Sequence, residues 1–137
     1  MLATNLTGLV NASQPFLLSN EPFVKTNDNV KLNEEGNGLL IVVPGLYKVR
    51  IQTNLYTIIP SGQSIGNAGA SLYINGQKVD DTEVVFAFTE NSRTETIIEY
   101  PIEVKRSDDA EEQVLVQFYS VADATLESGY VTVERIS

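Results

Sequence analysis

The chain has 137 residues and contains no cysteine, histidine or tryptophan, and its length suits one ordinary globular domain. Without cysteine and histidine it lacks a disulfide, a thiolate nucleophile, the commonest metal ligands and the base of a serine–histidine pair, so most enzyme classes are disfavoured. Nine basic residues against 18 acidic ones give a net charge of −9, which argues against nucleic-acid binding because phosphates are bound by clustered Lys and Arg.

Targeting signals are not evident in the sequence. The first basic residue is Lys25, so the N-terminal segment lacks the charged region of a secretory signal. The longest apolar run, Leu39–Val43, is far shorter than the roughly 20 residues that cross a membrane. We therefore expect no membrane partner.

The first 20 residues differ from the rest of the chain. They are mostly small and polar, with Leu6, Leu9 and Val10 as the early apolar residues. This composition predicts an N-terminal arm over 1–20, followed by a single domain over 21–137.

Apolar and polar residues alternate with a period of two over several later stretches, which is typical of half-buried β-strands. The clearest stretches are 47–55, 84–88, 94–104 and 114–118. No stretch has helical periodicity. Eight to ten strands in a chain of this length predict an all-β antiparallel sandwich or jelly roll.

Two positions predict how the strands are arranged. Asn75-Gly76 is the preferred pair of a two-residue hairpin turn, so we expect 70–74 and 77–88 to fold back on each other. Pro101 removes a backbone donor, which predicts an edge strand or a bulge.

Three strands carry apolar residues at positions expected to face solvent: Tyr73, Val85, Ala87, Leu115 and Tyr119. With no helix to cover such a face, a second subunit is the simplest cover. The alternative is the ordinary scatter of exposed apolar residues found on any surface. Phe86, Phe88 and Phe118 have the opposite parity and are expected in the core.

The order of three segments resembles the C1q-like and tumour-necrosis-factor-like jelly rolls. Leu39–Val49, with its Pro44-Gly45-Leu46-Tyr47, resembles the strand–turn–strand segment of that family. Ala70–Val79 is similar to its Asn-Gly hairpin, and 112–120 with 128–136 to its closing strands. The resemblance implies a ten-stranded jelly roll assembled as a homotrimer, with Tyr47 near the trimer axis.

Together, the outward parity and the resemblance give Tyr47, Tyr73, Val85, Leu115 and Tyr119 as candidates for the trimer interface. The sequence has no collagen stalk, which separates it from complement-type and cytokine-type biology.

The sequence resembles the bacterial and bacteriophage versions of this fold, and this resemblance implies a structural or adhesive role without catalysis. The leading hypothesis is a phage virion surface component, such as a head fibre, a decoration or a receptor-binding fibre tip. In that case the arm over 1–20 would attach to a capsid or tail protein. A module on a bacterial cell or spore surface is the alternative.

Acidic clusters are the remaining candidates for chemistry. Asp80-Asp81 with Glu83, and 108–112, lie beside expected turns, where solvated carboxylates are the default. Calcium bound by Asp108, Asp109 and Glu111 is the first alternative. A glycan-cleaving pair of carboxylates is the least favoured.

Two further features concern ligands. Gly62-Gln63-Ser64-Ile65-Gly66 matches the nucleophile elbow of serine hydrolases, but without histidine or a following helix we interpret it as a Gly/Ser loop. Gln63 and Asn67 in the loop over 60–69 are candidate contacts for a polar ligand, and a host-surface glycan is a candidate partner.

Overall fold

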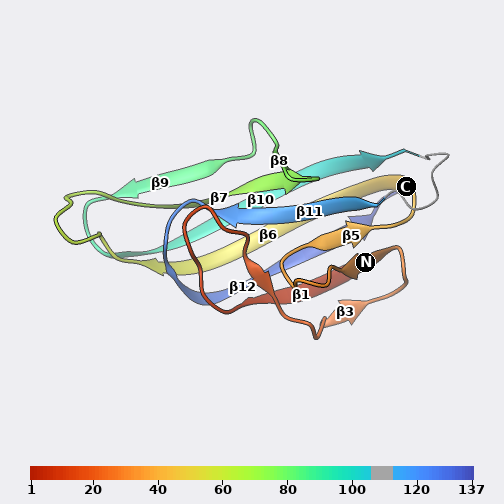
Figure 1. The fold of residues 1–137 in the computed structure, drawn as a ribbon, viewed down its shortest axis with the longest axis horizontal. Coiled ribbons are helices and arrows are strands. Elements are labelled where there is room, and N and C mark those ends of the chain that lie inside the picture. Colours follow the sequence, from red (N-terminus) through yellow and green to blue (C-terminus); the bar gives the residue numbers. More distant parts are fainter. Residues whose placement is uncertain (106–112) are drawn as a thin grey trace.

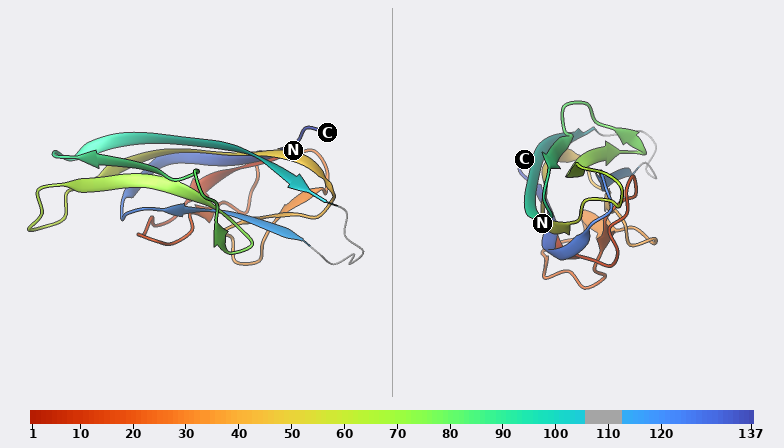
Figure 2. Two further views of the ribbon diagram at one scale, coloured as in Figure 1. Left: turned by 90° about the horizontal axis from the view of Figure 1, so that it is seen from above. Right: turned by 90° about the vertical axis from the view of Figure 1, so that its left-hand side faces the viewer.

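The structure is a computed structural model that describes residues 1–105 and 113–137. These residues form twelve strands in two antiparallel sheets. Figure 2 shows the sheets as two layers packed face to face. The all-β sandwich predicted from the alternation is thus confirmed, and three of the twelve strands are only two residues long. Within the described ranges, no helix is long and apolar enough to cross a membrane.

The first sheet has the order β10-β6-β12-β1-β2, with β3 also paired to β1. Its strands are β10 (Ser92–Val104), β6 (Gly45–Thr57), β12 (Thr125–Arg135), β1 (Leu2–Thr7), β2 (Leu17–Leu18) and β3 (Val24–Lys25).

The second sheet has the order β4-β5-β11-β7-β8, with β9 also paired to β7. Its strands are β4 (Val30–Leu32), β5 (Leu39–Ile41), β11 (Val114–Ser120), β7 (Gly66–Ile74), β8 (Gln77–Lys78) and β9 (Val84–Phe88). Figure 1 shows both chain termini towards one end of the sandwich and the β6–β7 connection at the other.

The long strand β6 is the centre of the first sheet. Every residue from Gly45 to Thr57 pairs with β10, and β12 pairs along the other side from Tyr47 to Tyr56. Alternate residues of β6 are buried, as the period of two predicts. The strand therefore sets the register of both neighbours.

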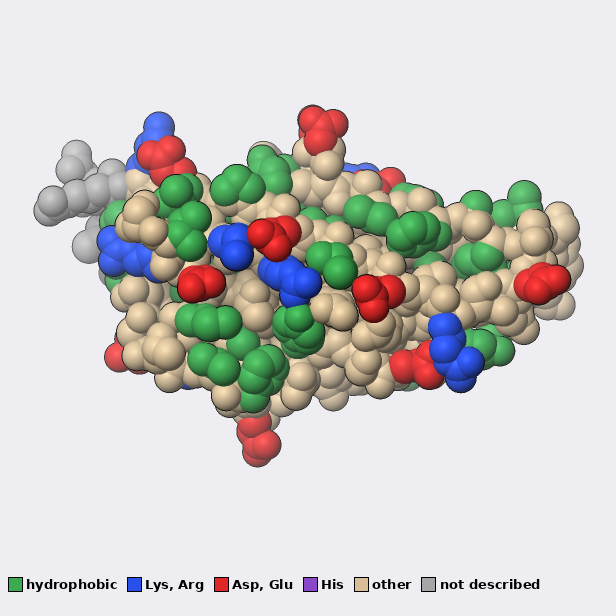
Figure 3. All heavy atoms as spheres, turned by 180° about the vertical axis from the view of Figure 1, so that it is seen from behind, with side chains coloured by type: hydrophobic (Ala, Val, Ile, Leu, Met, Phe, Trp, Pro, Cys, Tyr) green, Lys and Arg blue, Asp and Glu red, His purple; other side chains and the backbone are tan. Residues whose placement is uncertain are grey.

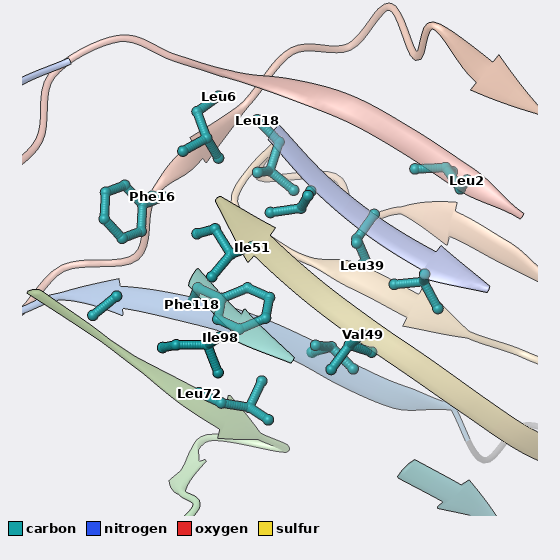
Figure 4. Packing of buried hydrophobic residues seen from close by; sticks show 14 of the residues in the cluster. Leu2, Leu6, Phe16, Leu18, Leu39, Val49, Ile51, Leu72, Ile98 and Phe118 are labelled. Carbon is teal, nitrogen blue, oxygen red and sulfur yellow. The ribbon is translucent and has the colours of Figure 1, made fainter. Parts of the chain in front are cut away.

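The core lies between the inner faces of the two sheets. Val49 and Ile51 of β6 face Leu39, Leu72 and Phe118 of the second sheet, as Figure 4 shows. All five side chains are at most 4% exposed. Burial of such aliphatic and aromatic surface, about 25 cal/mol for each Å², is the main force that holds the layers together.

The N-terminal residues are part of this sandwich. β1 pairs with β12 from Leu2 opposite Val133 to Asn5 opposite Tyr130. Leu2, Leu6, Val10, Phe16 and Leu18 all belong to the core cluster. In this structure the expected arm over 1–20 is therefore not separate from the domain over 21–137, because its few apolar residues recur at positions that face the core.

The hairpin at Asn75-Gly76 is confirmed. Both residues have positive φ, 51° and 80°, as a type I′ turn requires, and β7 pairs with β8 and then β9. The expected single strand over 77–88 is interrupted, however. The Thr82 hydroxyl accepts a hydrogen bond from the Leu72 amide at 3.2 Å and donates one to the Val79 carbonyl at 2.7 Å, so it takes the place of a strand residue.

The two prolines near strand ends behave as their chemistry predicts. Pro101 lies in β10, which is the edge strand of the first sheet, so its missing donor leaves no partner unpaired. Pro44 precedes Gly45, where the chain passes from β5 in the second sheet to β6 in the first. Gly45 has a φ of 155°, which residues with a side chain rarely adopt, and a Cβ here would lie 3.0 Å from the Ser137 carbonyl oxygen, so glycine is favoured at this crossing.

The interior of the sandwich becomes polar towards the end of β6. Thr53 of β6 lies opposite Thr96 of β10, and the two are 0% and 1% exposed. Among the described residues, neither hydroxyl has a hydrogen-bond partner, and the same holds for Thr94.

We predict that Thr53→Val raises the free energy of unfolding by about 1 kcal/mol, because it removes a buried hydroxyl that lacks a partner. The matched control is Thr4→Val. Thr4 is also 0% exposed, but its hydroxyl donates to the Ser19 carbonyl at 2.7 Å, so this change lowers the free energy of unfolding by about 1 kcal/mol. Urea unfolding measures both; an equal loss in the two variants would contradict the prediction.

Candidate functional site

The outer face of the second sheet carries a pair of stacked tyrosines. Tyr73 of β7 lies opposite Gln117, and Tyr119 of β11 lies opposite Ser71, so the two tyrosines are diagonal neighbours. Their ring centroids are 3.9 Å apart with an interplanar angle of 24°. Both side chains are half-buried. The two sequence positions predicted to face outward on different strands thus form one aromatic platform.

Leu115 and Val85 lie on the same face. Leu115 is opposite Leu40 of β5 and is half-buried, while Val85 is opposite Gly69 of β7 and is 47% exposed. Residues directly opposite each other share a face of a sheet, and Gly69 alternates with the buried Ala68 and Ala70. The structure therefore brings Tyr73, Val85, Leu115 and Tyr119 to one face.

The prediction that Tyr47, the fifth candidate, lies at the trimer interface is wrong. Tyr47 is 0% exposed in the core cluster between the sheets, and its hydroxyl donates to the Val43 carbonyl at 2.6 Å. The reason is its parity in β6, which it shares with the inward-facing Val49 and Ile51. A single chain already buries this side chain completely, so nothing of it remains for a second subunit to cover.

The expectation that Phe86 is a core residue is also wrong. Phe86 is 42% exposed, whereas Phe88 is half-buried and Phe118 is 4% exposed. Both faces of β9 are accessible, since Val85 is exposed as well. Parity in the sequence identifies opposite faces of a strand, but it does not say how far the other sheet extends to cover one of them.

The outer face of the first sheet has a different chemistry. Lys48 and Arg50 of β6 lie 3.7 and 3.5 Å from the Glu99 carboxylate of β10. Arg50 also donates to the Tyr130 hydroxyl, which in turn donates to Gln52 Oε1 at 2.9 Å. Figure 3 shows this face, with hydrophobic side chains interspersed among basic and acidic ones. Its aromatic and charged groups are thus largely paired with one another.

The acidic clusters do not form a described metal site. The calcium candidates Asp108, Asp109 and Glu111 lie outside the described residues. Within 1–105 and 113–137, no three Asp or Glu residues come together as metal ligands would. Glu83 is instead hydrogen-bonded to Lys78, and this bond is the main reason that the Lys78 pKa is raised.

The segment that matches a nucleophile elbow has none of the geometry of one. Ser64 lies in an exposed connection, and Gly66 begins strand β7 where an elbow would begin a helix. A serine without a base and without a helix N-terminus has no means of activation.

Comparison with known proteins supports the fold alone. No family model matches the sequence, and no curated protein sequence matches it. Among solved structures, the globular domain of a zebrafish complement 1qA protein is similar over 99% of this chain and 96% of its own, with a TM-score of 0.59 and 13% identity. The fold is a C1q-like jelly roll. In this C1q-like framework, residues 2–7 supply the strand next to the C-terminal one, and the stacked tyrosines lie on the opposite sheet.

The buried Tyr47 generates a prediction about pH. Burial raises its pKa more than the nearby Arg135 lowers it, so the folded chain retains the phenol proton above the ordinary pKa of 10.0, where the unfolded chain loses it. Folding stability therefore falls as the pH rises above 10. Tyr47→Phe loses the hydrogen bond to Val43, which costs about 1 kcal/mol at pH 7, but it has no proton to lose at this position.

We accordingly expect the stability difference between wild type and Tyr47→Phe to narrow above pH 10. Urea unfolding at neutral and alkaline pH measures this difference. Tyr56→Phe is the control, because Tyr56 is half-buried and lies outside the core cluster. A difference that stays constant from pH 7 to alkaline pH would contradict the assignment.

Proposed function

We propose that the protein is a non-enzymatic structural module that assembles as a homotrimer. The observation that carries the proposal is the outer face of the second sheet, which the stacked Tyr73 and Tyr119 share with Leu115 and Val85. The likeness to a complement globular domain over nearly the whole chain adds support, because the sequence segments that resemble that family imply a trimer.

The surroundings of the tyrosines support a protein contact. Lys31, opposite Leu40, and Lys78, opposite Tyr73, lie at the margins of the face. An apolar and aromatic centre with a polar rim is the usual arrangement of a protein interface. A trimer would carry about three times the charge of −9, and the Glu83 carboxylate near this margin is paired with Lys78, which limits repulsion between copies.

The biological setting is an extension of the same proposal. The leading hypothesis is that the protein lies on the surface of a phage virion, and the alternative is the surface of a bacterial cell or spore. The resemblance to trimeric fibre tips in bacterial and phage proteins supports this role. In the virion case, contact with a capsid or tail protein would involve the surface of the N-terminal residues, since β1 itself is paired within the sandwich.

We predict that Tyr119→Glu converts the trimer into a monomer, because three copies of a buried, unpaired carboxylate would be brought into the contact. The matched control is Ile97→Glu. Ile97 is 45% exposed and lies in β10 of the other sheet, so this change leaves the trimer intact. Sedimentation equilibrium measures both variants. A wild-type monomer would contradict the assembly, and dissociation by Ile97→Glu alone would move the contact to the first sheet.

The rival function, glycan cleavage by acidic residues, is tested separately. We expect no turnover when the chain is incubated with neutral and acidic polysaccharides and the reducing ends are counted. Hydrolysis that Asp109→Asn abolishes, and that Asp28→Asn leaves unchanged, would contradict the non-enzymatic assignment.

A further inference from the structure

A cleft of about 580 Å³ lies at the end of the sandwich that carries the β6–β7 connection. One wall comes from residues 56–67, and the other from residues 121–125, which are the β11–β12 connection and the first residue of β12, with Ala12 beside them. Figure 1 shows the β6–β7 connection reaching beyond the β11–β12 connection at the end away from the chain termini. The cleft is formed within one chain.

Hydrogen bonds fix both walls of this cleft. On one side, the Ile59 amide donates to Asn91 Oδ1 at 2.9 Å, which ties the β6–β7 connection to the start of β10. On the other, the Ala12 amide donates to Asp123 Oδ1 at 2.7 Å. A ligand would therefore meet a largely formed site and would lose little affinity to ordering of the loops.

Polar side chains in the cleft are left free to bind a ligand. Within the described ranges, the side chains of Gln63, Asn67 and Thr125 form no hydrogen bond, and all three line the cleft. Asp123 uses one carboxylate oxygen for Ala12, which leaves the other as an acceptor. Ser61 lines the cleft as well, so the site offers two amides, two hydroxyls and a carboxylate oxygen.

Apolar surface lies beside these groups. Ile58 and Ile65, which are 59% and 52% exposed, both line the cleft. Tyr56 also contributes to the lining, but its ring shares the outer face of the first sheet with Arg93, whose guanidinium lies 5.4 Å from the ring centroid. A ligand here would therefore contact an apolar face as well as the polar groups.

The charge of the lining narrows the ligand class. No Lys or Arg is among the described lining residues, and Asp123 and the net charge of −9 both disfavour an anion. A single carboxylate is too few for a metal cation, which takes six or more oxygens in a calcium site. A purely apolar ligand would bury the amides and the hydroxyls without partners, at a cost of about 1–3 kcal/mol for each.

We propose that this cleft binds a neutral saccharide. Sugar hydroxyls both donate and accept hydrogen bonds, so they satisfy the Asp123 carboxylate and the amides of Gln63 and Asn67 together. The C–H face of the sugar ring packs against Ile58 and Ile65. Such a pocket, with a few converging polar groups on an apolar wall, is the usual form of a small-ligand site.

This inference deepens the adhesive role proposed above and rests on it for its biological meaning. Its test is separate, because the cleft needs one chain while the tyrosine face needs three. A failure of sugar binding leaves the sedimentation result unchanged, and a monomeric chain still presents the cleft.

The experiment begins with the full chain on an array of neutral, sialylated and sulfated oligosaccharides. The strongest neutral oligosaccharide is then titrated while backbone amide signals are followed by NMR. We expect saturable shifts at Gln63, Asn67 and Asp123. Asp123→Asn and Asn67→Ala each weaken binding about tenfold, the loss of one good hydrogen bond, and Asp123→Asn retains an oxygen for the Ala12 amide.

Matched controls are Asp28→Asn and Asn20→Ala, which alter exposed residues away from the cleft and leave the affinity unchanged. Three results would overturn the proposal. They are an array without a neutral ligand, a preference for the sialylated or sulfated oligosaccharides, and amide shifts confined to residues outside the cleft.

Discussion

The pairing of β6 with both of its neighbours is the constraint on which the rest of the structure depends. All of Gly45–Thr57 pairs with β10, and most of it pairs with β12. A slip of one residue would turn Val49 and Ile51 to the surface and bring Lys48 and Arg50 into the core, so the register is strongly specified. The register of β6 determines the register of β12, and β12 in turn determines that of β1, which places Leu2 opposite Val133.

Local patterns in the sequence predicted the positions of strands and turns well, but they predicted the burial of individual side chains less well. The period of two located the long strands, Asn75-Gly76 located the hairpin, and Pro101 located an edge, because each depends on backbone chemistry within a few residues. The burial of Tyr47 and the exposure of Phe86 depend on how far one sheet covers the other. That overlap is a property of the packed layers, and no short pattern contains it.

The same limit applies to the candidate site. Outward parity correctly brought Tyr73, Val85, Leu115 and Tyr119 to the surface, but only the strand order shows that they share one sheet. The cleft was visible in the sequence only as Gln63 and Asn67. Asp123 and Thr125, on the opposite wall, follow β11 and come close only because the chain crosses from one sheet to the other.

The two ends of the sandwich differ, because the chain termini lie towards only one of them. Both termini lie towards one end (Figure 1), and the cleft lies at the end that carries the β6–β7 connection. In a cyclic trimer every copy points the same way along the symmetry axis, so three clefts would open around a single tip. Attachment through either terminus would leave that tip free. If the three clefts each bound one saccharide on the same surface, the trimer would bind that surface far more tightly than a single cleft does, because of multivalency alone.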